Sequence, residues 1–219
     1  MILEIQNLTK KYIQGTSTIE ALSDINFSME TGETLAIVGP SGSGKTTLLS
    51  LLAGLESATG GVVKIQGQNL FDLNERELSL FRSHHIGIVF QQFHLMPHLT
   101  ALENVCLPLD IQGDENAAKK GLNALESVGL AHRQSHLPSE LSGGECQRVA
   151  IARAIAVEPK VLLADEPSGN LDADTGNRVM DLVFDLVSKN RMTLILVTHN
   201  TELAKRCQRQ VSLRGGKIQ

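Results

Sequence analysis

The sequence is poor in the features that mark several classes of protein. Its three cysteines lie far apart at positions 106, 146 and 207, with no C-x-x-C pair, which disfavours a disulfide scaffold or a cysteine metal site and fits a reducing compartment. The net charge of −4 argues against a nucleic-acid partner, which would usually need a basic face. No signal peptide is evident at the N-terminus.

Long hydrophobic runs are also missing. The longest, at 47–55 and 192–197, fall well short of the about 18 residues that a membrane span needs, so we expect any membrane role to come through a partner chain. No Gly-, Ser- or Pro-rich linker, repeat or low-complexity tract divides the 219 residues. With 42% hydrophobic and 20% charged residues, the chain can bury a sizeable core, and it is expected to form one cassette.

Apolar, β-branched segments alternate with helical periods, which predicts an α/β fold with a mostly parallel sheet. Short polar turns join the earliest strands, which favours an antiparallel sheet there, and residues 92–157 show no convincing strand and are predicted to be a helical insert. The predicted strands are 2–8, 21–29, 34–38, 61–65, 86–90, 161–164, 193–197 and 210–213, and the predicted helices are 45–55, 75–83, 116–128, 144–156, 174–189 and 201–206.

A phosphate-binding loop is the clearest motif. The residues from Gly39 to Thr46 fit G-x-x-x-x-G-K-[ST], with a predicted strand before them and a predicted helix after them. Glycines let the backbone wrap around phosphate oxygens, and N–H groups at the helix start face the anion. Lys45 is expected to reach the β- and γ-phosphates and the Thr46 hydroxyl to coordinate Mg²⁺.

A second motif is the apolar strand 161–164, which ends in two carboxylates. Ligands bind at the carboxyl ends of strands in open α/β sheets. Asp165 is therefore expected to help hold Mg²⁺, and Glu166 to orient or deprotonate the attacking water.

The residues Leu141-Ser-Gly-Gly-Glu145, followed by Gln147-Arg148 and a predicted helix, resemble the signature motif of ATP-binding cassette (ABC) proteins. The resemblance covers nearly the whole chain. It implies a P-loop NTPase (RecA-like) core with an antiparallel β subdomain, at 1–91 and 158–219, and an inserted α-helical subdomain at 92–157. It also implies ATP and Mg²⁺ as ligands, and a homodimer that sandwiches two ATP molecules head to tail.

The resemblance assigns roles to further residues. Gln91 is expected to touch Mg²⁺ and the attacking water, His199 the γ-phosphate, and Asp172 the dimer interface. Tyr12, the only tyrosine, is expected to stack on adenine through its flat ring. The expected nucleotide-binding residues are Tyr12, Gly39, Pro40, Ser41, Gly42, Ser43, Gly44, Lys45, Thr46, Thr47, Ser142, Gly143, Gly144, Glu145 and Asp172; the catalytic ones are Lys45, Gln91, Glu166 and His199; the metal ligands are Thr46, Gln91 and Asp165.

The resemblance further implies a separately encoded membrane permease, which would hold the chain on the cytoplasmic face of the inner membrane. Hydrophobic residues after Gln91, at 93–105, could form an exposed loop that receives the permease, or could simply pack the insert. Short segments such as 168–172 resemble those of the lipoprotein-release, macrolide-export and cell-division cassettes, which form one branch of the family. A conventional importer or drug exporter, a non-transport cassette and a P-loop kinase are the alternatives. Cys146 stands where many relatives have glutamine, and we hypothesise that it makes activity sensitive to thiol reagents.

Overall fold

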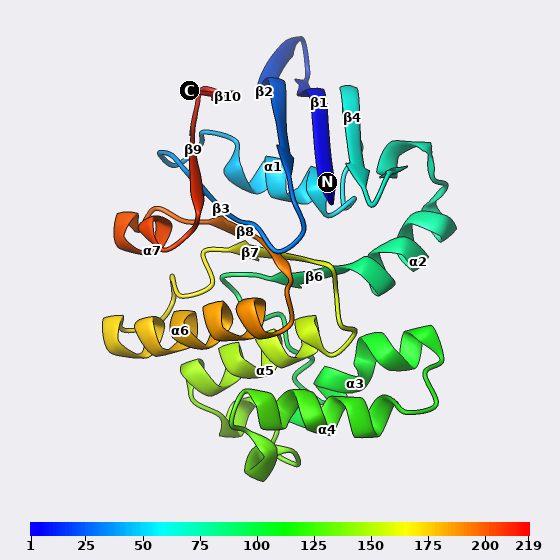
Figure 1. Ribbon diagram of the computed structural model, residues 1–219, viewed down its shortest axis with the longest axis vertical. Helices are drawn as coiled ribbons and strands as arrows, with labels where there is room; N and C mark the ends of the chain where they lie inside the picture. Colours follow the sequence, from blue (N-terminus) through cyan, green and yellow to red (C-terminus); the bar gives the residue numbers. More distant parts are fainter. The chain divides into compact units, whose positions relative to one another are not determined.

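The computed structural model describes all residues, 1–219, and they form two compact units. The first unit combines Met1–Arg82 with Thr193–Gln219, and the second is Ser83–Met192. Figure 1 shows the elements of both. No helix has both the length and the apolar character that a membrane span requires.

The first unit contains a four-stranded antiparallel sheet in the order β2-β1-β4-β5. Its strands are β1 (Leu3–Gln14), β2 (Ser17–Met29), β4 (Gly60–Ile65) and β5 (Gln68–Asn69), and the first three run side by side in Figure 1. Apolar side chains alternate along β1, so that Leu3, Ile5 and Leu8 are fully buried. A sheet with one buried face shows this alternation.

A β-bulge interrupts β1. Gln6 pairs with Val62 and Thr9 with Gly60, so two residues of β1, Asn7 and Leu8, lie opposite the single residue Gly61. The extra residue reverses the two-residue side-chain period. The odd-numbered Leu3 and Ile5 face the core before the bulge, and the even-numbered Leu8 does so after it.

The first unit also holds a parallel sheet, in which β3 (Thr34–Val38) pairs with β8 (Thr193–Val197) on one side and β9 (Arg209–Arg214) on the other. Strand β10 (Lys217–Ile218) joins β9 antiparallel. All five β8 side chains are buried, as expected for a strand covered on both faces. The helices are α1 (Lys45–Leu52), α7 (Thr201–Lys205), the 3₁₀ turn η1 (Leu70–Asp72) and α2 (Glu75–His85), which contains the unit boundary.

The second unit pairs strands β6 (Ile86–Val89) and β7 (Val161–Asp165) in parallel. Helix α5 (Gly143–Ile155) contacts α3 (Ala101–Gln112), α4 (Ala117–Ser127) and α6 (Ala173–Lys189), an arrangement visible in Figure 1. Two 3₁₀ turns, η2 (Ala131–Arg133) and η3 (Pro138–Glu140), lead into α5. Most residues of α5 are buried because neighbouring helices surround it.

The α/β class with parallel and antiparallel sheets is confirmed, and every predicted strand and helix is present. Three features differ from the sequence reading. The hairpin strands extend to Gln14 and Ser17, and two short strands (β5 and β10) were not expected. Helix α3, at 101–112, includes the end of the segment 93–105 that could have formed an exposed loop. The segment 92–157 lies inside the second unit, and its limits as a subdomain stay a prediction.

Candidate nucleotide site

The loop predicted to bind phosphate, from Gly39 to Thr46, is called the phosphate-type loop below. It connects β3 to α1 in the first unit. Gly44 caps α1 in the left-handed region, with φ of 102°, and a Cβ on it would lie 2.6 Å from the backbone oxygen of Ala21. Only glycine fits this position. No side chain caps α1, and its first turn has no acidic residue, so the positive end of the helix is left for an anion.

The side chain of Lys45 contacts the backbone of this loop. Its Nζ donates to the carbonyl oxygens of Gly39, at 2.9 Å, and Pro40, at 3.0 Å. A cavity of about 320 Å³ opens beside it, lined by residues of the loop, of β2 and of the β9–β10 turn. Its lining residues are Ile19, Glu20, Ala21, Gly42, Gly44, Lys45, Thr46, Thr47, Gly215 and Gly216.

The loop suits a phosphate chain in two further respects. The buried hydroxyl of Ser43 has no hydrogen-bond partner, and a buried polar group of this kind calls for one. Gly42 also has a left-handed φ of 76°, and a Cβ on it would have no protein atom within 4 Å, so the space beside it is open. The site therefore combines a cationic side chain and a bare helix N-terminus beside one cavity, with an unpaired hydroxyl buried within the loop.

His199 lies at the same sheet edge as this loop. Strand β8 is parallel to β3, with Val197 opposite Ile37, so the chain leaves both strands at their shared carboxyl end. The neighbouring Asn200 caps α7 by accepting from the N–H groups of Glu202 and Leu203. This cap fixes the backbone that presents His199.

In the second unit, β7 ends in the two predicted carboxylates. Glu166 has a left-handed φ of 47°, a conformation that costs a non-glycine residue about 1–3 kcal/mol and is found preferentially at functional sites. Its carbonyl oxygen accepts from the N–H of Gly169 at 2.9 Å, which closes the turn. The local geometry thus holds the side chains of Asp165 and Glu166 at the end of a buried strand.

Gln91 is brought to this turn. Its side-chain amide donates to Asn170 Oδ1 at 3.0 Å, and Asn170 Nδ2 donates to the Gln91 carbonyl at 3.1 Å. A Cβ on Gly169 would lie 2.9 Å from Gln91 Nε2. Asn170 was not among the predicted site residues, although it belongs to the quoted motif at 168–172.

The signature residues begin helix α5. Ser142 is the N-cap: its hydroxyl accepts from the N–H of Glu145, whose carboxylate accepts from the N–H of Ser142 at 2.8 Å. Arg133 Nε donates to the same carboxylate at 3.1 Å. These hydrogen bonds lower the pKa of Glu145, and those with Ser142 have the largest effect. The S-x-x-E spacing indicates this capping box in the sequence, whereas nothing local points to Arg133.

The signature also packs against the start of α6 in its own chain. A Cβ on Gly144 would lie 2.5 Å from Thr175 Cγ2, so glycine is needed for this close approach. Asp172 caps α6 by accepting from the N–H of Thr175 at 3.0 Å, and its role at the dimer interface stays a prediction. Ser142 and Gly143 nevertheless remain exposed, whereas Gly144 is buried.

Cys146 is buried beside Pro138, and burial raises the pKa of its thiol. Both properties disfavour reaction with a thiol reagent, because the thiolate is the reactive form. Tyr12 lies on β1, near Thr47 at the start of α1. Of the predicted residues, Tyr12, the phosphate-type loop and His199 belong to the first unit; Gln91, the signature residues, Asp165, Glu166 and Asp172 belong to the second.

The fold has parallel strands and the phosphate-type loop, strand β7 ends in two carboxylates, and helix α5 begins with two glycines. Together these features define an ATP-binding cassette. The family model described as "ABC transporter" matches residues 22–169, and the chain belongs to that family. It is 48% identical over 219 residues to the lipoprotein-releasing system ATP-binding protein LolD of Geobacter metallireducens, covering 99% of this chain and 97% of that one. It is also 47% identical to the uncharacterized ABC transporter ATP-binding protein YbbA of Escherichia coli K12, over 100% of this chain and 96% of that one.

A solved structure of similar fold is the dimeric ABC cassette MJ0796 in a post-hydrolysis state bound to ADP and Pi. Its TM-score is 0.91 at 40% identity, over 100% of this chain and 97% of that chain. The chain is thus an ATP-binding, ATP-hydrolysing ABC subunit in the branch of LolD. These findings confirm the predicted family, fold and activity.

Proposed function

We propose that two copies of this chain close on two ATP molecules and thereby drive a separate membrane permease. The observation that supports this most directly is the exposure of Ser142 and Gly143 at the N-terminus of α5. A signature buried in its own chain could not meet a second copy. The dimeric state of the solved cassette MJ0796 points the same way.

In this proposal each γ-phosphate is bound by Lys45 of one copy and by Ser142 of the other. The α1 N-terminus and the Ser43 hydroxyl would add donors to the phosphate chain. Because ATP needs hydrogen-bond donors from both copies, it acts as part of the interface. Cleavage and loss of phosphate remove these contacts, and the copies separate.

Oxygen donors suited to Mg²⁺ are present in Thr46, Gln91 and Asp165. A bound Mg²⁺ would neutralise charge on the β- and γ-phosphates. The chain's own contribution is positioning: Glu166 accepts a proton from, or orients, the attacking water, while Gln91 is fixed by Asn170. His199 would donate to the γ-phosphate from the end of β8.

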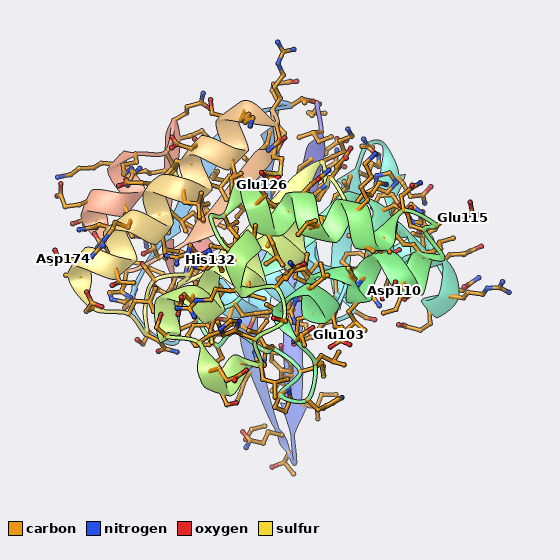
Figure 2. The ribbon with its side chains drawn as sticks, turned by 90° about the horizontal axis from the view of Figure 1, so that it is seen from below. Glu103, Asp110, Glu115, Glu126, His132 and Asp174 are labelled. Atoms are coloured by element: carbon orange, nitrogen blue, oxygen red, sulfur yellow. The ribbon has the colours of Figure 1, made fainter.

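The decisive test replaces Glu166 with Gln, which keeps shape and removes the base. Gel filtration with ATP and Mg²⁺ should give a dimer that persists, and steady-state ATP hydrolysis should fall at least about 100-fold. Glu126→Gln, an exposed change on α4 labelled in Figure 2, is the matched control and should behave as wild type. A Glu166→Gln protein that stays monomeric at high concentration with ATP, with or without its permease, would refute the sandwich.

A second surface fits the permease. Ile88, Leu107, Pro108 and Ile111 line an open cavity of about 260 Å³ between β6 and α3, and Ile111 is 74% exposed. We assign this cavity to a cytoplasmic helix of the permease. Of the hydrophobes at 93–105, by contrast, Val105 packs the insert and Leu95, Leu99 and Leu102 are half-buried.

Charge supports this occupant. Glu103 and Asp110 share the helical face of Leu107 and Ile111 by their spacing on α3, and Figure 2 shows both side chains labelled on that helix. Cytoplasmic segments of membrane proteins carry an excess of Lys and Arg. The lining also contains Arg153, whose guanidinium donates to the carbonyl oxygens of Phe93 and His94. The exposed carboxylates of α3 beside the cavity are complementary to such a segment.

The docking test compares two exposed apolar residues of neighbouring helices. Affinity purification of the tagged chain from detergent-solubilised membranes should recover a permease with predicted membrane helices; Ile111→Lys should lose it, and Leu122→Lys on α4 should keep it. Equal recovery by both variants would refute this surface. A permease with few membrane helices and a large periplasmic domain supports the lipoprotein-release or force-transmitting branch, whereas a large multi-span partner supports a conventional importer or exporter. Recovery of the wild-type chain in the membrane fraction would by itself support attachment at the cytoplasmic face.

A further inference from the structure

The ring of Tyr12 is held from its edge. Its hydroxyl donates to Glu56 Oε2 at 2.6 Å, in a partly buried setting. Burial raises the pKa of Tyr12, and the hydrogen bond from Tyr12 lowers the pKa of Glu56. The pair is therefore a charge-assisted hydrogen bond between a neutral phenol and a carboxylate, which is stronger than a bond between neutral groups.

One face of the same ring is covered by Lys10. The Lys10 ammonium lies 4.8 Å from the ring centroid, within range of a cation–π interaction. It also lies 3.1 Å from Glu56 Oε2 and donates to the Ser57 carbonyl at 2.7 Å. Lys10 and Tyr12 thus share one carboxylate oxygen, and a planar ligand can approach the ring only from the opposite face.

The bulge in β1 decides which face of the strand these side chains occupy. The reversed period after Asn7 puts Leu8, Lys10 and Tyr12 on the same side of the strand. The backbone there is fastened to the loop after α1: Thr59 N–H donates to the Thr9 carbonyl at 2.9 Å. Strand and loop therefore hold the two partners in register before any ligand binds.

Glu56 in turn is fixed to the phosphate-type loop. Helix α1 begins at that loop and ends in a Schellman motif, in which Gly54 N–H donates to Leu51 O and Leu55 N–H donates to Ser50 O. Glu56 follows directly. One short helix, about 12 Å long for its 8 residues, thus joins the phosphate end of the cavity to the carboxylate that holds Tyr12.

We propose that Glu56, with Lys10, is a positioning residue that fixes the Tyr12 ring relative to the phosphate-type loop, with one face open for a nucleotide base. This inference rests on the proposed role of Tyr12 in stacking on adenine. The placement supports it: Ile19, opposite Tyr12 in the hairpin, and Thr47, adjacent to its hydroxyl, both line the phosphate cavity. A ring held in advance binds a base without the entropy cost of ordering it.

The test measures equilibrium binding of ATP and of inorganic triphosphate, which has no base. Tyr12→Ala should weaken ATP binding about 10–100-fold, as the loss of base stacking does elsewhere. Tyr12→Phe keeps the ring and loses the tether, so it and Glu56→Ala should each weaken ATP binding about 3–10-fold. The double variant Tyr12→Phe/Glu56→Ala should be no weaker than Glu56→Ala alone, because the Tyr12–Glu56 bond is already lost there together with the Lys10 ion pair.

Triphosphate affinity should be unchanged in all of these variants. In ATPase assays KM should rise and kcat should stay the same, because the lost binding is equal in ground and transition states. Glu4→Ala is the matched control, since Glu4 is a β1 carboxylate with an ion pair of its own, 3.9 Å from Lys64. It should bind ATP as the wild type does.

The outcomes separate the two levels of the argument. If Tyr12→Ala binds ATP normally, the stacking role itself is wrong. If Tyr12→Ala is weak but Tyr12→Phe and Glu56→Ala bind as wild type, stacking stands and the positioning role is refuted. Weakened triphosphate binding by Glu56→Ala, or additive losses in the double variant, would also overturn it, because Glu56 would then act through general damage to the fold.

Discussion

The β1 bulge depends on Gly61, and the neighbouring Gly60 supplies a matched control. Gly61 has a left-handed φ of 90°, and a Cβ on it would lie 2.4 Å from the Asn7 carbonyl oxygen and 2.6 Å from that of Gln6. Gly60 has no such φ, and a Cβ on it would meet nothing within 4 Å. Both glycines are exposed on β4, so Ala at either position adds the same methyl group.

The expected cost of Gly61→Ala has separate origins. Left-handed backbone costs Ala about 1–2 kcal/mol. The methyl group must push β4 from the Asn7 backbone, which weakens one or two ladder hydrogen bonds worth about 1 kcal/mol each. Loss of flexibility in the unfolded chain returns about 0.4–1 kcal/mol. We expect a net destabilisation of about 2–3 kcal/mol, whereas Gly60→Ala keeps only the last, favourable effect.

Thermal unfolding followed by circular dichroism tests this difference. For a chain of this size about 1 kcal/mol shifts Tm by roughly 2–4 °C, so Gly61→Ala should lower Tm by about 4–12 °C and Gly60→Ala should not lower it. Because the bulge also sets the face of Tyr12, Gly61→Ala should weaken ATP binding as well. Equal Tm values for the two variants would show that the bulge tolerates a side chain and that the reasoning is wrong.

Further predictions concern titrating groups. Burial raises the pKa of Cys207 to about 11, so only about one in a thousand of its thiols is ionised at pH 8, and a thiol reagent should label the native protein slowly and the urea-unfolded protein at once. Cys146 should behave likewise, whereas labelling of it in the native state that abolishes ATPase activity would support the thiol-sensitivity hypothesis. The pKa values of Glu56 and Glu145 are lowered in the folded state, so the stability that they add is present above their unfolded values near 4.5 and is lost as pH falls through the folded values. Urea midpoints measured from pH 7 to pH 3 should fall over this acid range, and less so in Glu145→Gln; a midpoint independent of pH would contradict this.

The contiguous motifs could be predicted from the sequence because their physics is local. A strand, a glycine-rich loop and a helix start follow one another within residues 34–46, and the spacing of Ser142 and Glu145 indicates the cap of the signature helix. The buried strands were equally visible, since β7 and β8 are continuous apolar runs. Each of these signals is complete within one window of the chain.

The features that were missed depend on distant partners. Tyr12 and Glu56 are 44 positions apart, and no pattern in either segment indicates their hydrogen bond. The outer hairpin is polar, so strand pairing rather than an alternating burial pattern defines it. Helix α3 contains Pro108, which usually ends a helix, but a capping box of Thr100 and Glu103 begins it.

Two helices of this chain, α1 and α5, would bind phosphate at their N-termini in different ways. Helix α1 has no side-chain cap and offers its bare N–H groups, whereas Ser142 caps α5. Capping uses the Ser142 oxygen as an acceptor, and its O–H is a separate donor, since a hydroxyl can do both. In the chain by itself that donor interacts with the Glu145 carboxylate, so the proposed contact with ATP requires it to turn from Glu145 to the phosphate. The cap and the proposed contact with the partner's ATP are therefore separable properties of one side chain.

Two substitutions separate them. Ser142→Asp keeps a good cap and adds charge favourable to the helix start, but it also places a second carboxylate beside Glu145, so its Tm should stay close to that of the wild type. In the Glu166→Gln background, however, its carboxylate faces the γ-phosphate with no proton to donate, and the ATP-dependent dimer should be lost. Ser142→Ala should lose the dimer and also about 1 kcal/mol of stability. If Ser142→Asp forms the dimer with wild-type affinity, Ser142 serves only as a helix cap, because a bare carboxylate would be repelled by ATP at that contact.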